Sequence, residues 1–237
     1  MKRKEGDGRT RKTADRCRDR GPERVGRGAA FGVPGYASVR QLAEDENVDL
    51  VVVAVKVPRH HELILPVPAA GVPVLSEWPF AVDPAEAEEM HRAARGTRAF
   101  IGLRGRSSPT TRWLADLVAG GYAGEVLSAT VLASSVEWGT PVSERMRYTL
   151  DRALGATMLT VAFGHGIDLV SMIVGELQDV VASTTVRRPL VPLGRTGRRV
   201  PMTAEDQCTP PEASRWSPRE TSSRCSPTAR SHARRTG

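Results

Sequence analysis

The chain has 237 residues, 40% of them hydrophobic, which is enough for one large domain or two small ones around a packed core. Its formal net charge is +7, but residues 1–28 carry +6 and residues 208–237 carry +4, which leaves −3 for residues 29–207. A mildly acidic centre lacks the basic face that specific nucleic-acid binding requires, so we expect no specific nucleic-acid partner. All three cysteines lie in the charged ends, without metal-binding spacing, and no apolar run is long enough to span a bilayer. We therefore expect a cytoplasmic protein with no metal site and no membrane contact.

The two ends have the composition of disordered segments. Residues 1–28 are rich in arginine and contain Val25 as their single branched aliphatic residue. In residues 208–237, 20 of 30 residues are Ser, Pro, Thr or Arg, and Leu, Ile, Val and Phe are absent. Such segments cannot bury enough apolar surface to offset the entropy lost on ordering. We expect both ends to be disordered tails and the folded protein to comprise residues 29–207.

The first part of the folded region alternates between strand and helix patterns. Residues 48–55 (VDLVVVAV) form a short apolar run of mostly β-branched residues, as a strand buried on both faces of a parallel sheet requires. The pattern then predicts a helix over 60–70, a strand over 72–75, a helix over 85–95 and a strand over 100–103. This alternation predicts an α/β fold, with an incomplete Rossmann-like parallel sheet in residues 29–106.

The pattern changes after Arg106. A helix is expected over 108–118, a longer strand over 125–134, a helix over 166–175 and a strand over 179–188. Longer strands with intervening helices predict a second, α+β domain over 107–207 with an open sheet. We include a homodimer formed through this sheet among the expected partners.

The segment from Tyr36 to Ala94 carries the most specific motifs, which are VKVPRHHEL after the first strand and SEWPF after the second. With these motifs it resembles the second part of the Rossmann domain in Gfo/Idh/MocA dehydrogenases. In that family a strand that ends near a proline is followed by a histidine, a helix, a glycine and a strand that ends in Glu-Lys-Pro. This chain has the same order, with Pro58, His60, Gly71 and Glu77-Trp78-Pro79. His60 and Glu77 are 17 positions apart, which is the family's usual interval.

Further segments are similar to the subgroup of this family that contains the fungal galactose-regulon repressor. They are VKVPRHHEL, SEWPF, LRGRSSPTTRWLADLVAGGYAGEVLS and FGHGIDLV, and the resemblance covers Phe31 to Gln207. The repressor is a dehydrogenase-like protein that binds a dinucleotide and contacts a transcription activator. The resemblance thus implies either an enzyme or a regulator.

The resemblance implies NAD or NADP as cofactor and a small sugar or polyol as substrate. The carboxyl end of the strand over 48–55 lies where doubly wound sheets bind ligands. The implied cofactor-binding residues are Val55, Lys56, Val57, Pro58, His60, Glu77, Trp78 and Pro79. Arg104 and Arg106 could meet a carboxylate or phosphate, although arginines that follow a strand are solvated more often than not.

The implied catalytic residues are His165 and Lys56. His165 matches the family's general acid/base histidine, and Lys56 is the only lysine in residues 29–207. However, Trp78 stands where the family has its catalytic lysine, and an indole cannot carry a charge or take up a proton. Val161 stands where the family has an aspartate four residues before the histidine. A packed, hydrogen-bonded His165 is therefore an equally weighted interpretation.

The Gly-rich turn that binds the pyrophosphate has no counterpart in this sequence. No GxGxxG motif precedes Tyr36, and GDGRTRK has neither a strand before it nor an apolar helix after it. We therefore predict that NAD(P) binding is weakened or lost.

Three functions remain open. The first is a sugar- or polyol-directed NAD(P)-dependent oxidoreductase, impaired or truncated in this chain. The second is a non-catalytic regulator that senses a dinucleotide or sugar. The third is a defective product in which both ends are read out of frame, as the 30 arginines against 4 lysines suggest.

Overall fold

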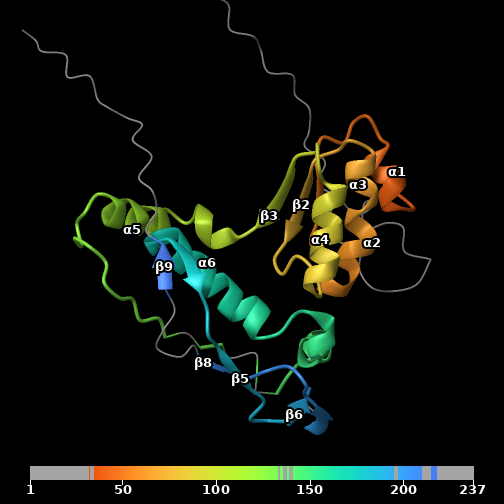
Figure 1. Ribbon diagram of the computed structural model, residues 1–237. Coiled ribbons are helices and arrows are strands. Elements are labelled where there is room, and N and C mark those ends of the chain that lie inside the picture. The colour runs from red at the N-terminus through yellow and green to blue at the C-terminus, as the bar shows by residue number, and fades with distance from the viewer. Residues whose placement is uncertain are drawn as a thin grey trace, which may run out of the picture.

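The computed structural model describes residues 32, 35–132, 134–135, 138, 141–194, 197–209 and 215–217. These residues form a parallel sheet with its helices, followed by a region of helices and short antiparallel ladders (Figure 1). The predicted boundary between two domains near residue 107 stays a prediction. Within the described residues, no helix is long and apolar enough to cross a membrane.

The parallel sheet has the strand order β1-β2-β3. Its strands are β1 (Val51–Val53), β2 (Val74–Glu77) and β3 (Ala99–Gly102). Parallel pairing aligns Val53 with Ser76, and Glu77 with Gly102, so the carboxyl ends of the strands meet at one edge. The structure confirms the predicted α/β class.

The helices of this part are short and have clear capping signals. They are α1 (Val39–Ala43), the 3-10 turn η2 (Val57–Arg59), α2 (His60–Ile64), α3 (Pro66–Ala69) and α4 (Pro84–Ala93). Asp83 caps α4 by accepting a hydrogen bond from the Glu86 N–H at 2.9 Å, and Pro84 fits the first helical position. A break at Leu65, before Pro66, divides the single helix predicted over 60–70 into α2 and α3.

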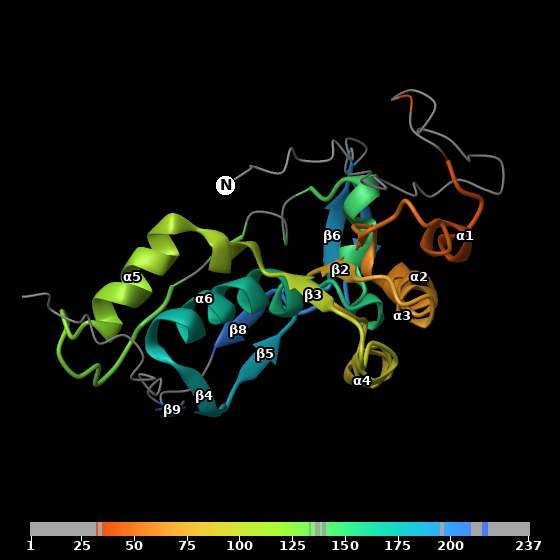
Figure 2. The same cartoon turned by 90° about the horizontal axis from the view of Figure 1, so that it is seen from above.

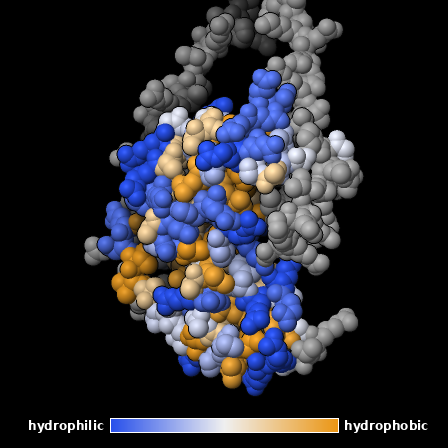
Figure 3. Space-filling view, turned by 90° about the vertical axis from the view of Figure 1, so that its right-hand side faces the viewer, coloured by the Kyte–Doolittle hydropathy of each residue, from blue (hydrophilic) through white to orange (hydrophobic). Residues whose placement is uncertain are grey.

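Helices α1 to α4 lie on one side of the sheet (Figures 1 and 2). The core between these layers contains Val48, Val51, Val53, Ile64, Val67, Val74 and Met90. On the outside of this part, hydrophilic and apolar residues are intermixed (Figure 3). The β-branched residues of β1 and β2 fill this core, whereas Phe100 and Ile101 of β3 are 51% and 43% exposed. The hydrophobic pattern therefore explains the burial of the first two strands but not that of β3.

The second part begins directly after β3. Its helical segments are η3 (Arg104–Ser107), α5 (Pro109–Ala119), η4 (Glu144–Leu150), η5 (Arg152–Leu154), the π-helical turn η6 (Leu159–Phe163) and α6 (Gly164–Val174). Helix α6 packs against α5 and η3 (Figures 1 and 2). The predicted helices over 108–118 and 166–175 therefore correspond to α5 and α6.

The strands of the second part pair into three antiparallel ladders, β4–β9, β5–β8 and β6–β7. They are β4 (Glu176–Asp179), β5 (Ser183–Thr185), β6 (Leu190–Leu193), β7 (Arg198–Pro201), β8 (Gln207–Thr209) and β9 (Arg215–Ser217). A second core lies around β6 and β7, with Trp138, Val142, Leu150, Val191, Leu193, Val200, Met202 and Ala204.

The longer strand predicted over 125–134 is wrong. Residues 125–132 have no regular secondary structure, and Leu127 and Leu132 are 85% and 94% exposed. An apolar alternating pattern makes a strand only where a neighbouring strand pairs with its backbone, and no described strand pairs with this segment. The strand predicted over 179–188 is also interrupted, because residues 180–182 separate β4 from β5.

The prediction that residues 208–237 are disordered is wrong in part. β8 and β9 pair with β5 and β4, so residues 208–209 and 215–217 are ordered strands. Composition measures how much side chain can be buried, whereas a ladder depends on backbone groups that every non-proline residue has. The remainder of this tail, and residues 1–28, lie outside the described residues.

Candidate functional site

A cavity of about 140 Å³ lies at the carboxyl ends of β1 and β2. The parallel part contributes Val55, Val57, His60, Glu77, Trp78 and Pro79 to its lining. The second part contributes Trp138, Met146, Tyr148, Thr149, Ala156 and Val161. Six of the eight residues implied as cofactor-binding therefore face one cavity, while Lys56 and the exposed Pro58 are not part of its lining.

His60 joins two segments of the cavity wall. Its ring is 1% exposed, with Nε2 at 3.1 Å from the Val55 carbonyl and Nδ1 at 3.0 Å from the Phe80 carbonyl. The Ser76 hydroxyl lies 3.3 Å from Nδ1. These partners hold the chain after β1 against the chain after β2. The geometry gives His60 a role in shaping the site, and direct contact of its ring with a cofactor stays a prediction.

Lys56 lies beside the cavity. Its ammonium nitrogen is 5.1 Å from the centre of the Tyr148 ring, within the range of a cation–π interaction. Tyr148 belongs to η4 and lines the cavity. Lys56 therefore brings a positive charge from the end of β1 to the second part of the molecule.

Trp78 is held by the second part through its indole. Its Nε1–H donates to the Thr160 carbonyl at 2.6 Å. A Cβ atom on Gly164 would lie 2.7 Å from Nε1, so the indole packs directly on the glycine backbone. Thr160 lies in η6, where the Phe163 N–H bonds to the Met158 carbonyl five residues back. Such π-helical turns occur frequently at functional sites.

His165 follows Gly164 in α6 and is partly buried, but it does not line the cavity. Burial, and then the positive charge of Arg104, lower the pKa of His165, while Asp168 acts in the opposite direction. With Val161 in place of the family's aspartate, the sequence pattern indicated no carboxylate that orients His165. Asp168 provides one, three residues later on the same helix, and the H-x-x-D spacing was the signal that could have found it.

Asp168 also forms an ion pair with Arg106. The Arg106 Nε and Nη2 atoms lie 2.6 Å and 2.5 Å from Asp168 Oδ1, and this bond raises the pKa of Arg106. At the other end of the segment, Glu205 is 4% exposed and accepts hydrogen bonds from the Thr157 hydroxyl and the Leu159 N–H. Together these contacts fix η6 and α6, and with them the position of His165.

The residues around the cavity fit the nicotinamide end of a dinucleotide better than the whole cofactor. A cavity of about 140 Å³ is smaller than the roughly 300–1,000 Å³ that is usual for ligand sites. The strand ends around it supply the expected crevice position. The sequence has no Gly-rich turn that would present backbone N–H groups to the pyrophosphate. The lining thus offers a small ligand aromatic side chains, with the Glu77 carboxyl group as a hydrogen-bond acceptor.

Two family models match this chain. Residues 13–103 match an oxidoreductase family with an NAD-binding Rossmann fold, and residues 109–209 match the C-terminal domain of Gal80p. These matches meet at the segment that includes η3.

Several known proteins are similar in sequence. Dehydrogenase aclE from Aspergillus oryzae is 35% identical, over 68% of this chain and 45% of its own length. The galactose/lactose metabolism regulatory protein GAL80 from Saccharomyces cerevisiae is 27% identical, over 72% of this chain and 43% of its own length. Trans-1,2-dihydrobenzene-1,2-diol dehydrogenase from Mus musculus is 30% identical, over 61% and 43%. The chain thus spans less than half the length of these curated relatives.

Solved structures show the same fold. A super-repressor mutant of Gal80p from Saccharomyces cerevisiae superimposes with a TM-score of 0.71 and 25% identity, over 78% of this chain and 51% of that one. An NAD-binding oxidoreductase from Klebsiella pneumoniae gives 0.62 and 22%, over 76% and 49%. The second likeness bears on the fold alone.

Proposed function

We propose, on the premise that the chain belongs to the Gfo/Idh/MocA oxidoreductase family, that it is an NAD(P)-dependent oxidoreductase-like protein for a sugar or polyol, with impaired turnover. The observation that carries this proposal is the hydrogen bond from Trp78 to the Thr160 carbonyl at 2.6 Å. The Trp78 indole N–H is already hydrogen-bonded to a backbone carbonyl, and an indole cannot take up a proton. Trp78 therefore cannot replace the lysine that the family uses in proton transfer. Position 78 instead makes a structural contact between the parallel part and η6.

The ligand class follows from the lining of the cavity. The indoles of Trp78 and Trp138 and the Tyr148 ring line the cavity, together with the Glu77 carboxyl group. A few polar groups among apolar side chains fix the orientation of a small ligand. A sugar or polyol combines apolar C–H faces with hydroxyl groups and suits such a lining. NAD or NADP, when bound, would supply or accept the hydride.

The groups left for proton transfer are Lys56 and His165. Lys56 is held against the Tyr148 ring, and His165 has a lowered pKa, which keeps it neutral and able to accept a proton near neutral pH. Neither residue lines the cavity. Since general acid/base catalysis requires hydrogen-bond reach to the substrate, this geometry supports slow turnover at most.

Turnover assays with NAD and NADP on a panel of aldoses and polyols test the proposal. The assays use cofactor at a concentration on the order of 10 mM, to compensate for the weak binding expected without a Gly-rich turn. We expect a slow rate at most for the wild-type chain, and a faster rate in Trp78→Lys, which restores an amine at this position. Trp113→Lys is the matched control, because Trp113 is 59% exposed on α5 and its replacement changes only the surface. Wild-type turnover as fast as that of Trp78→Lys would contradict the proposal.

The second candidate function is a non-catalytic, ligand-sensing regulator. It is favoured by Trp78 and by the exposed apolar side chains of Tyr122, Leu127 and Leu132, which are 82%, 85% and 94% exposed. Exposed apolar side chains are common features of surfaces that bind other proteins, including a second copy in a homodimer. A sugar that binds the wild-type chain and Trp78→Lys alike, without turnover in either, would favour this function. Sedimentation velocity would test the homodimer.

A further inference from the structure

Three side chains in the cavity wall already use their hydrogen-bond donors within the protein. The Trp78 indole N–H donates to the Thr160 carbonyl at 2.6 Å. The Trp138 indole N–H donates to the Thr149 carbonyl at 3.3 Å, and the Thr149 hydroxyl donates to the Met146 carbonyl at 2.8 Å. A ligand therefore cannot accept hydrogen bonds from these groups without breaking the contacts that they make.

Two further polar side chains of the wall differ in what they offer a ligand. Both ring nitrogens of His60 lie against backbone carbonyls, at 3.0 Å and 3.1 Å. Glu77 is exposed at the carboxyl end of β2, and within the part of the chain that the structure describes its carboxylate forms no hydrogen bond or ion pair. Among the described residues that line the cavity, Glu77 is also the only Asp, Glu, Lys or Arg. The wall thus offers a ligand a negatively charged acceptor.

Aromatic side chains line the same cavity, namely those of Trp78, Trp138 and Tyr148. The face of an aromatic ring attracts a cation, and a carboxylate close by strengthens that attraction. The Lys56 ammonium group, which is not part of the lining, lies 5.1 Å from the centre of the Tyr148 ring, so a ring of this wall already attracts a cation. A cavity of about 140 Å³ keeps any ligand close to these rings and to Glu77.

We propose that the cavity binds the ammonium group of an amino polyol, with Glu77 as its counter-ion, so that the preferred ligand is cationic and not neutral. This inference rests on the proposed polyol function. An ammonium group has three donors and no acceptor, so it suits a wall whose indole and hydroxyl donors are used and whose carboxylate is not. A neutral hydroxyl forms a weaker bond to the same carboxylate, and an anionic ligand is repelled by it.

Calorimetric titration of the full chain compares three probes with the same carbon chain: D-glucitol, D-glucamine and D-gluconate. The first is neutral, the second carries an ammonium group at neutral pH, and the third carries a carboxylate. At low ionic strength the wild-type chain should bind D-glucamine about tenfold more tightly than D-glucitol, because the amine gains a charge-assisted bond and a cation–π contact. D-gluconate should bind more weakly than D-glucitol.

Three variants locate the effect. Glu77→Gln keeps the size of the side chain and removes its charge, so the advantage of D-glucamine should fall to about twofold or less. Glu88→Gln is the matched control, since Glu88 is exposed on α4 and does not line the cavity, and it should leave all three affinities unchanged. Lys56→Met removes a positive charge that repels a ligand cation, so it should tighten D-glucamine binding by about twofold or more.

Equal affinities for D-glucitol and D-glucamine, or tightest binding of D-gluconate, would overturn the ammonium site and leave the polyol site standing. An unchanged advantage of D-glucamine in Glu77→Gln, an equal loss in Glu88→Gln, or weaker D-glucamine binding in Lys56→Met would have the same consequence. Failure of every probe to bind would overturn both the ammonium site and the proposed function.

Discussion

The structural role of Trp78 predicts a measurable cost for removing a single N–H group. Trp78→Phe keeps an aromatic ring in place and deletes the donor that bonds the Thr160 carbonyl at 2.6 Å. A hydrogen bond contributes about 0.5–1.5 kcal/mol net, and an acceptor left unsatisfied in a buried position costs about 1–3 kcal/mol. Trp78 is only partly buried, so water can solvate part of the freed carbonyl. We expect a loss of about 1–2 kcal/mol in the free energy of unfolding.

Urea unfolding, followed by far-UV circular dichroism, measures this loss. Trp113→Phe is the control, since Trp113 is 59% exposed and its replacement should change stability by less than about 0.5 kcal/mol. If Trp78→Phe unfolds at the wild-type midpoint with an unchanged slope, the indole bond contributes nothing. The claim that this position has become a structural contact would then be wrong.

Contacts around the same helix give three further expectations. Gly164→Ala places a methyl group 2.7 Å from the indole nitrogen and should lower the thermal midpoint by the equivalent of about 1–3 kcal/mol, whereas Gly166→Ala, with no atom within 4 Å, should be neutral or stabilising. Asp168→Asn should cost about 1 kcal/mol in urea unfolding, and a double-mutant cycle with Arg106→Gln should show that the two losses are not additive; additive losses would refute the pair. Because burial and Arg104 lower the pKa of His165, the unfolded chain binds the proton more readily, so stability should fall as the pH drops through and below the ordinary histidine range, and His165→Gln should reduce this dependence; an unchanged pH profile would count against it.

The parallel part could be predicted because its signals are local. The run at 48–55 and the caps at Asp83 and Pro84 each specify an element without reference to distant residues. The strand came out shorter than its apolar run, since β1 extends only over the residues that pair with β2. Across this sheet, local pattern and long-range pairing agree.

The second part was harder to predict because its structure depends on distant partners. Residues 125–132 have the alternation of a strand, but the described strands offer them no ladder. Conversely, residues 215–217 have no apolar pattern, yet they pair with β4. Backbone pairing between segments far apart in sequence leaves no mark on local composition.

Of the residues that line the candidate site, only those contributed by the parallel part were predicted from the sequence. The residues at the strand ends could be named from the family's motif, whereas Trp138 and Tyr148 reach the cavity from a region without a motif. The same is true of Asp168, whose partner Arg106 lies 62 residues away in sequence. Such contacts are fixed by tertiary packing, which a single sequence does not display.

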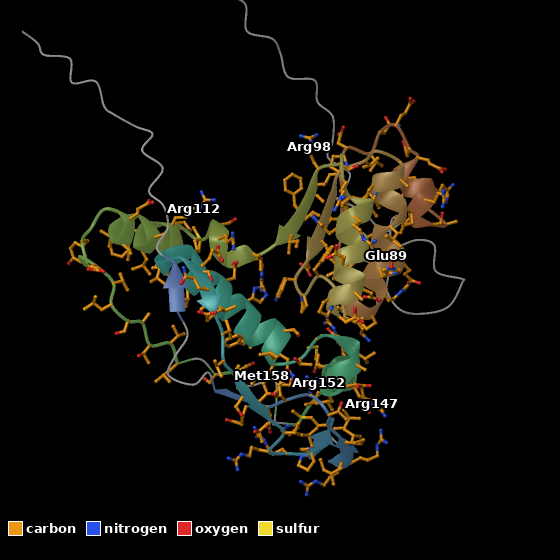
Figure 4. The ribbon with its side chains drawn as sticks, viewed as in Figure 1. Glu89, Arg98, Arg112, Arg147, Arg152 and Met158 are labelled. Carbon is orange, nitrogen blue, oxygen red and sulfur yellow. The ribbon has the colours of Figure 1, made fainter. Side chains whose placement is uncertain are left out.

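Both a polar contact and apolar packing determine the position of α4. His61 on α2 lies 2.9 Å from Glu89 on α4, and Figure 4 shows Glu89 on the side of α4 that faces α2. Met90, the next residue, is fully buried against the sheet. Acidic and apolar residues of α4 thus face different neighbours, with Glu89 toward α2 and Met90 toward the sheet.

Calorimetric titration of the full chain with NAD and with NADP tests most directly whether this site holds only the nicotinamide end of its cofactor. The pyrophosphate depends on backbone N–H groups of a Gly-rich turn that the sequence lacks, and the cavity of about 140 Å³ accommodates only a small part of a dinucleotide. We expect no saturable heat for either cofactor, which corresponds to a dissociation constant weaker than about 1 mM. A dissociation constant in the micromolar range for either one would contradict this account of the site.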